Sequence, residues 1–109
     1  MPRGGLGDLE RKVLAAILRL NGEGYAVSIA GEIETRLGKP LSLGAVYATV
    51  DRMEGKGLIS SRLGEPTAVR GGKPKRFYQI EAPGLHALSD ARESDRLLWS
   101  AMPPMELPA

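Results

Sequence analysis

Apolar residues recur along this chain at intervals of three and four, a pattern that predicts four amphipathic helices. Asp8 is expected to cap the first helix, and Gly38 followed by Pro40 is expected to end the second. The short connection after the second helix is typical of a helix-turn-helix. The predicted helices run from Asp8 to about Leu20, from about Ala26 to Leu37, from about Leu43 to Lys56, and from roughly Ala82 to Ala101.

The third predicted helix has one apolar face, formed by Leu43, Val46, Val50 and Met53. Ser42 stands at its N-cap position, and Gly57 stands where a left-handed residue commonly stops a helix. The residues that point away from the apolar face are small or polar, and Tyr47 and Thr49 lie on its flanks. This helix therefore offers a polar surface for recognition.

Two β-prone runs follow, Leu58–Leu63 and Arg76–Ile80, and they predict a hairpin, called the wing below. Phe77 and Tyr78 alternate along the second strand, so one of them is expected to face the core. The connecting loop is long and rich in Gly and Pro, so we expect it to be mobile without a ligand. No acid occurs from residue 66 to 80, and the same segment carries four bases: Arg70, Lys73, Lys75 and Arg76.

This order of elements predicts a mainly α protein with a small β-hairpin wing, a winged helix-turn-helix of order ααα-ββ-α with a C-terminal dimerisation helix. A polar helix beside a basic hairpin is typical of winged helices that bind DNA. The expected parts are a flexible N-terminus at 1–7, a winged-helix DNA-binding domain at 8–81, a dimerisation helix at 82–102 and a disordered tail at 103–109.

Charge changes this picture through its distribution, because the net charge is only +2. Acids gather in the early helices and late in the chain, while bases gather in the wing, so one face should carry a positive potential. The chain has no cysteine, which excludes disulfides, thiol catalysis and Cys-bound zinc. With His86 as its single histidine and no cluster of ligands, we expect no metal or other cofactor.

Enzymatic activity is not expected, because no nucleophile–base pair and no phosphate-binding glycine loop is visible. No apolar run approaches the ~20 residues that span a bilayer, and no signal peptide is visible. We therefore expect a cytoplasmic protein.

Several motifs together resemble the PadR family of bacterial transcriptional regulators. They are GYAVSI at the second helix, GAVYATVDRMEGKGLISSRLGEP through the third helix and first strand, and RGGKPKRFYQI into the second strand. The resemblance covers about Leu6 to Ala91 and implies that the third helix enters the DNA major groove while the wing contacts backbone or minor groove. It also implies a homodimer through the last helix, and repression, with release from DNA by a small molecule in several members. Glu81 departs from the Thr or Ser that often caps the last helix in the family, and that helix is short.

Five residues of the third helix are the DNA-contact candidates, and the wing bases are candidates for phosphate contacts. Ser42 and Gly44 would let the backbone approach a phosphate, Tyr47 and Thr49 would reach a phosphate or base edge, and Arg52 would bind a base or phosphate. Two alternatives stay open: Tyr47 packs under the wing while Arg52 is solvated, and the wing bases merely keep a hairpin edge soluble.

Two apolar surfaces without obvious cover suggest a two-fold homodimer. The dimer-interface candidates are Leu14, Leu18, Leu85, Leu88, Leu98, Trp99 and Met102. Such a dimer would place two recognition helices about 34 Å apart and read a roughly palindromic operator. Trp99 is either a packing anchor there or part of a pocket for a small aromatic effector, which the resemblance suggests. The rival to a DNA-binding regulator is a winged helix that serves as a protein–protein interaction module without sequence-specific DNA binding.

Overall fold

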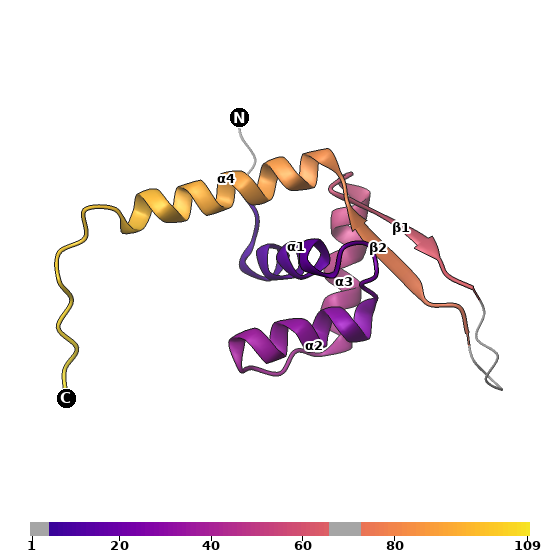
Figure 1. Ribbon diagram of the computed structural model, residues 1–109, viewed down its shortest axis with the longest axis horizontal. Coiled ribbons are helices and arrows are strands. Elements are labelled where there is room, and N and C mark those ends of the chain that lie inside the picture. Colours follow the sequence, from indigo (N-terminus) through magenta and orange to yellow (C-terminus); the bar gives the residue numbers. More distant parts are fainter. Residues whose placement is uncertain (1–4, 66–72) are drawn as a thin grey trace.

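The computed structural model describes residues 5–65 and 73–109, and Arg70 of the predicted wing bases lies outside these ranges. Within them the chain forms four helices and one two-stranded antiparallel sheet (Figure 1). The elements are α1 (Asp8–Leu20), α2 (Ala26–Leu37), α3 (Leu43–Gly55), β1 (Ile59–Leu63), β2 (Arg76–Ile80) and α4 (Ala82–Trp99). The predicted fold class, a mainly α winged helix of order ααα-ββ-α, is confirmed.

The core lies where α1, α2 and α3 meet, beside the base of the hairpin. Its fully buried side chains include Val13, Ile17, Ile29, Val46, Val50 and Met53. Leu14 also belongs to this core and is 0% exposed, so its assignment to a dimer surface is wrong. The physical reason is that α2, α3 and the hairpin together surround most of α1, which leaves Leu18 rather than Leu14 at the surface.

Local signals set the ends of α3. The Ser42 hydroxyl accepts a hydrogen bond from the Ala45 N–H at 3.1 Å, which confirms the predicted N-cap. At the other end Gly57 has φ +78°, its N–H donates to the Glu54 carbonyl, and the Leu58 N–H donates to the Met53 carbonyl at 3.0 Å. These two bonds form a Schellman motif, so the predicted glycine stop is confirmed.

The beginning of α1 differs from the prediction. Gly7 is the N-cap and Asp8 is the first helical residue. The Glu10 carboxylate accepts a hydrogen bond from the Gly7 N–H at 2.9 Å and so takes one free donor of the first turn. Asp8 instead pairs with Arg11 and Lys12 at the surface.

The wing is fastened to the α1–α2 turn. Its register pairs Ile59 with Ile80 and Leu63 with Arg76. The Tyr78 N–H donates to the Gly24 carbonyl at 2.9 Å, which forms an isolated antiparallel bridge beside the two-stranded sheet. Tyr78 is the buried member of the aromatic pair, as strand alternation requires, while Phe77 is half-buried on the other face.

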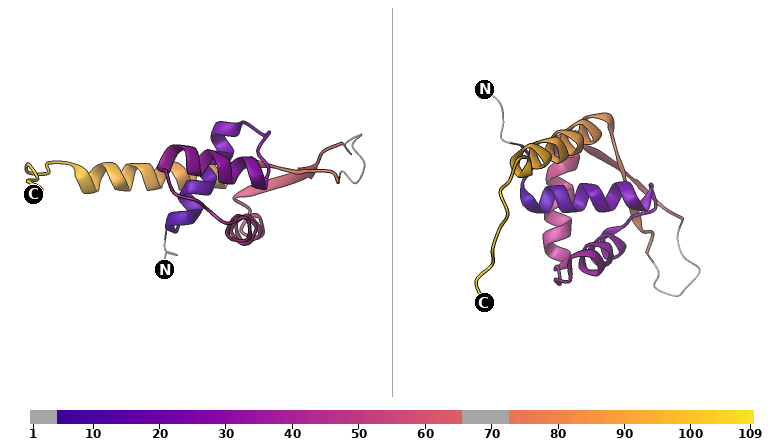
Figure 2. Two further views of the ribbon diagram at one scale, coloured as in Figure 1. Left: turned by 90° about the horizontal axis from the view of Figure 1, so that it is seen from below. Right: turned by 60° about the vertical axis from the view of Figure 1, so that its left-hand side comes forward.

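α4 leaves the core and extends to the side opposite the wing (Figures 1 and 2). Its first turn is tightly packed, because a Cβ at Gly84 would lie 2.2 Å from the Leu58 carbonyl oxygen, and Leu88 one turn later also packs against the core. The helix ends at Trp99, so Met102 lies beyond it and the predicted end at residue 101 or 102 is slightly too late. No helix of the described residues is long and apolar enough to cross a membrane.

Candidate nucleic-acid interface

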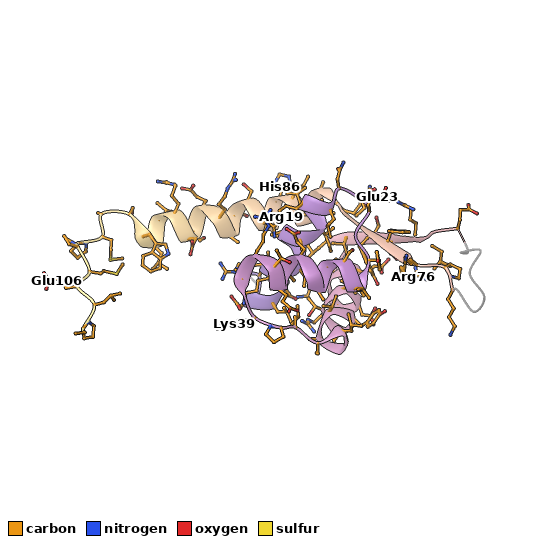
Figure 3. The ribbon with its side chains drawn as sticks, turned by 60° about the horizontal axis from the view of Figure 1, so that its bottom comes forward. Arg19, Glu23, Lys39, Arg76, His86 and Glu106 are labelled. Carbon is orange, nitrogen blue, oxygen red and sulfur yellow. The ribbon has the colours of Figure 1, made fainter. Side chains whose placement is uncertain are left out.

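One open groove brings the exposed side of α3 together with the wing. It has a volume of about 370 Å³ and lies between the first turn of α2, the middle of α3 and the outer part of the hairpin. Arg76, labelled in Figure 3, lies on the hairpin side of this groove. The groove is lined by Tyr25, Ala26, Val27, Tyr47, Leu63, Pro74, Lys75, Arg76 and Tyr78.

The first turns of α3 present three of the five candidates to solvent. Ser42 and Gly44 are exposed, and nothing lies within 4 Å of a Cβ placed on Gly44. The Tyr47 ring is 51% exposed and lines the groove. A partner could therefore approach the backbone of this turn closely, and free N–H groups at a helix start favour a negatively charged group.

Thr49 does not belong to this surface. It is 1% exposed, and its hydroxyl donates to the Ala45 carbonyl at 2.7 Å. Its assignment as a DNA contact is therefore wrong. The side chain sits at the edge of the apolar face of α3, and the bond to the preceding turn satisfies its only polar group inside the core.

Arg52 lies near the other end of α3 and is held against α1. Its Nε donates to Glu10 at 3.3 Å, and the Lys56 ammonium lies 3.3 Å from the same carboxylate. The Glu10 side chain is 8% exposed. The pKa of Glu10 is lowered chiefly by the Gly7 hydrogen bond, with burial opposing and the two α3 cations assisting. Arg52 thus has a structural partner, although half of its side chain remains accessible.

The described bases of the wing are exposed. Lys73, Lys75 and Arg76 all face solvent. The Arg76 guanidinium donates to the Ser61 hydroxyl at 2.9 Å, and Ser61 donates to the Glu54 carboxylate at 2.8 Å, so Arg76 is tied through the hairpin to the end of α3. These two hydrogen bonds hold the Arg76 guanidinium in one orientation.

The sequence patterns did not single out two further residues, Tyr25 in the lining of this groove and Lys39 outside it. Tyr25, the N-cap of α2, makes an edge-to-face contact with Phe77, with ring centroids 5.9 Å apart. Lys39 is exposed in the turn between α2 and α3, at the far end of α2 from the wing (Figure 3). Lys39 could have been noticed from the sequence, because it is a basic residue in the turn of a helix-turn-helix. The Tyr25–Phe77 contact joins positions too far apart for a local pattern to reveal.

A second, larger groove of about 630 Å³ lies between α1, α2 and α4. Its apolar lining includes the predicted dimer residues Leu18, Leu85 and Leu88, and a basic rim includes Arg19 and Arg36. Leu98, Trp99 and Met102 lie further along the chain and are exposed, with the Trp99 ring 51% accessible. Among the described residues no group of His, Asp and Glu side chains could hold a metal ion.

Comparisons with solved structures show the fold. The chain superposes on a PadR family transcription regulator from hypervirulent Clostridium difficile R20291 with a TM-score of 0.74 and 23% identity, covering 88% of this chain and 95% of that one. A transcriptional regulator from Clostridium thermocellum gives 0.70 and 22%, covering 83% and 84%. A PadR-like transcriptional regulator from Bacillus cereus gives 0.67 and 23%, covering 83% and 82%.

The sequence itself shows the family. No curated protein sequence is significantly similar to this chain. The model of the transcriptional regulator PadR-like family matches residues 13–90, which is well over half of the chain and includes α2, α3 and the wing. The chain therefore belongs to the PadR-like family of transcriptional regulators.

Proposed function

We propose that this DNA-binding regulator is a homodimeric repressor that reads a palindromic operator with α3 and the wing. One observation carries the proposal: Tyr47 on the exposed side of α3 lines the same open groove as the wing bases Lys75 and Arg76. A recognition helix and a cationic hairpin on one face can contact a base edge and the flanking phosphates at the same time.

In this proposal the first turns of α3 enter the major groove. Tyr47 donates its hydroxyl to a base edge or phosphate, and Ser42 and Gly44 allow close approach of the helix backbone to a phosphate. Lys73, Lys75 and Arg76 supply phosphate contacts, and Arg70, which lies outside the described residues, is a fourth candidate. Arg52, near the C-terminal end of α3, adds a further DNA contact while it remains paired with Glu10.

The proposed dimer covers the apolar surfaces of α4. Leu85, Leu98 and Trp99 are exposed in the single chain, and the groove between α1, α2 and α4 is open beside them. We propose that α4 of a second copy packs against this groove and against the same helix of the first copy, because burying these side chains removes apolar area from water. Two copies of α3 would then face successive major grooves about 34 Å apart.

A small aromatic effector is proposed to act at the dimer through Trp99. The ring is exposed at the end of α4 and is not part of the lining of the groove that ends at Asp95. A flat ligand would therefore need the partner copy to complete its pocket. Quenching of the single Trp by planar compounds, lost in Trp99→Leu, would support this role. No quenching across a panel of such compounds would leave Trp99 as a packing anchor.

A second candidate, a protein-binding winged helix, is favoured by one observation. Val27, Tyr47 and Leu63 expose apolar surface in the groove beside the wing. Protein interfaces are rich in such side chains at their centres, whereas DNA contacts depend on the neighbouring cations.

Fluorescence anisotropy distinguishes the two candidates. The purified protein is titrated into a duplex from upstream of its own gene and into a scrambled duplex, at several salt concentrations. Tight binding that prefers the upstream duplex and weakens steeply with salt is the expected result. Weak binding that is equal for both duplexes, repeated with duplexes from neighbouring promoters, would favour the protein-binding candidate.

A further inference from the structure

The wing needs contacts outside its own two strands to keep a fixed orientation relative to the helices. An isolated two-stranded hairpin is marginally stable in water. Here the hairpin is joined to the α1–α2 turn by the Tyr78–Gly24 hydrogen bond and by Arg62, which donates to the Gly22 carbonyl at 3.1 Å. These contacts fix the two strands of the wing, but they do not reach Lys75, which lies just before the start of β2.

A row of four side chains extends this attachment outward. The Arg62 guanidinium lies 4.8 Å from the centre of the Phe77 ring, Phe77 meets Tyr25 edge to face at 78°, and the Lys75 ammonium lies 4.7 Å from the centre of the Tyr25 ring. We call Arg62, Phe77, Tyr25 and Lys75 the wing anchor. It connects β1, β2 and the start of α2, and it ends on a cation that lines the groove.

The way in which Lys75 is held leaves it available to an anion. A ring attracts an ammonium through its π-electron face without occupying the N–H donors as a carboxylate would. Within the described residues no carboxylate lies within ion-pair distance of Lys75. Tyr25 is also the N-cap of α2, so the ring that holds the ammonium lies at a helix N-terminus, where partial positive charge favours an anion.

We propose that Tyr25 and Phe77 are positioning residues that order Lys75 on the DNA-facing side of the wing before DNA binds. A free lysine loses considerable side-chain entropy when it is fixed on a phosphate. A lysine already held on a ring loses less, so the same phosphate contact contributes more to affinity. This inference rests on the proposed function, because it concerns how the wing meets a phosphate backbone.

A double-mutant cycle on DNA binding tests the inference. The probe is a mixed-sequence duplex several turns long at low salt, since a phosphate contact does not depend on sequence. Tyr25→Leu should weaken binding about two- to fivefold, while Tyr25→Phe, which keeps the ring, should bind like the wild type. In a Lys75→Met background, Tyr25→Leu should cause no further loss. In a Lys73→Met background it should cause the same loss as in the wild type.

A second readout does not depend on DNA. In the free protein the ε-methylene protons of Lys75 should be shifted upfield by the Tyr25 ring relative to those of Lys73, and Tyr25→Leu should remove the shift. Thermal unfolding of each variant checks that the domain remains folded.

The outcomes separate the two claims. A wild type that binds no duplex overturns the proposed function and, with it, this inference. A wild type that binds, together with a Tyr25→Leu loss of equal size in the wild-type and Lys75→Met backgrounds, overturns the inference alone. An unshifted Lys75 signal in the free protein also overturns it, because the cation would then not rest on the ring.

Discussion

At the scale of single residues, Glu10 connects two helices that the sequence pattern treats separately. Its carboxylate accepts a hydrogen bond from the Gly7 N–H at the start of α1 and lies 3.3 Å from Arg52 of α3 and from Lys56, the C-cap of that helix. Glu10 is the buried member of this group, while Arg52 and Lys56 are half exposed, so the cost of removing its charge lies in weakening the hydrogen bonds and ion pairs of a buried carboxylate. Glu10 therefore ties the position of α3 to α1.

Glu10→Gln should lower the free energy of unfolding by about 1–3 kcal/mol at pH 7. The pKa of Glu10 is lowered in the folded chain by the Gly7 hydrogen bond and, against burial, by Lys56 and Arg52, so its contribution is complete above the ordinary value of 4.5 and disappears as pH falls through the lowered pKa. Urea unfolding of wild type and variant should thus differ at pH 7 and converge in acid. Glu32→Gln, at a surface carboxylate between Arg19 and Arg36, is the matched control with a smaller effect. Equal losses in both variants would contradict the role given to Glu10.

Gly44 has no steric reason within the chain to be glycine. Gly44→Ala should raise thermal stability slightly, because alanine favours a helix, and should weaken DNA binding if a phosphate meets the backbone there. Gly55→Ala, at the other end of α3 and equally free of contacts, should stabilise without changing affinity. The melting temperature of each variant measures its stability, and fluorescence anisotropy with a DNA duplex measures its affinity. Unchanged DNA affinity in Gly44→Ala would remove this turn from the interface.

Residue roles could be predicted from the sequence only in part. Periodicity gives the direction of a side chain around its own helix, which is why Val46, Val50 and Met53 were placed correctly in the core. It does not say which other elements cover that direction. Leu14 and Thr49 were misplaced for this reason, and the Glu10–Arg52 pair, separated by 42 positions, has no local signal.

At the scale of elements, the prediction succeeded where the signal is local. α2 and β2 have the predicted bounds, and both ends of α3 follow from a serine cap and a left-handed glycine. The wing anchor and the close packing of the first turn of α4 on Leu58 depend on contacts between distant segments. They could not be predicted from patterns within one element.

The first turn of α4 rests on the hairpin base through Gly84. Gly84→Ala should destabilise the domain by about 1–3 kcal/mol, because the new methyl group would collide with the Leu58 carbonyl and backbone cannot yield as a side chain does. The effect is measured by chemical denaturation. A variant as stable as the wild type would show that α4 can shift along the hairpin without cost.

At the scale of the whole molecule, the single chain is more extended than a compact domain of the same length. Its radius of gyration is 16.5 Å, against about 13 Å expected for a compact domain of this size. The excess comes from α4 and the segment after it, which extend away from the core (Figure 1). Exposed Leu97, Leu98 and Trp99 on this extension are the main reason to expect a second copy.

Leu98→Asp should convert the proposed dimer into a folded monomer. The side chain is 65% exposed in the single chain, so a charge there leaves the core intact but opposes burial at an interface. Val27→Asp, at an apolar residue of similar exposure on the wing side, should leave the dimer unchanged. Sedimentation equilibrium measures both. A wild type that is monomeric at micromolar concentration would contradict the dimer.

Selection of binding sites from a pool of random duplexes by the purified protein tests the central claim most directly. Two copies of α3 related by a two-fold axis should enrich an inverted repeat whose half-site centres lie about 10 base pairs apart. Tyr47→Ala should lose that preference while keeping salt-sensitive binding through the wing. A pool that remains random after repeated rounds, or that enriches only single half-sites, would contradict a dimeric regulator that reads its operator with α3.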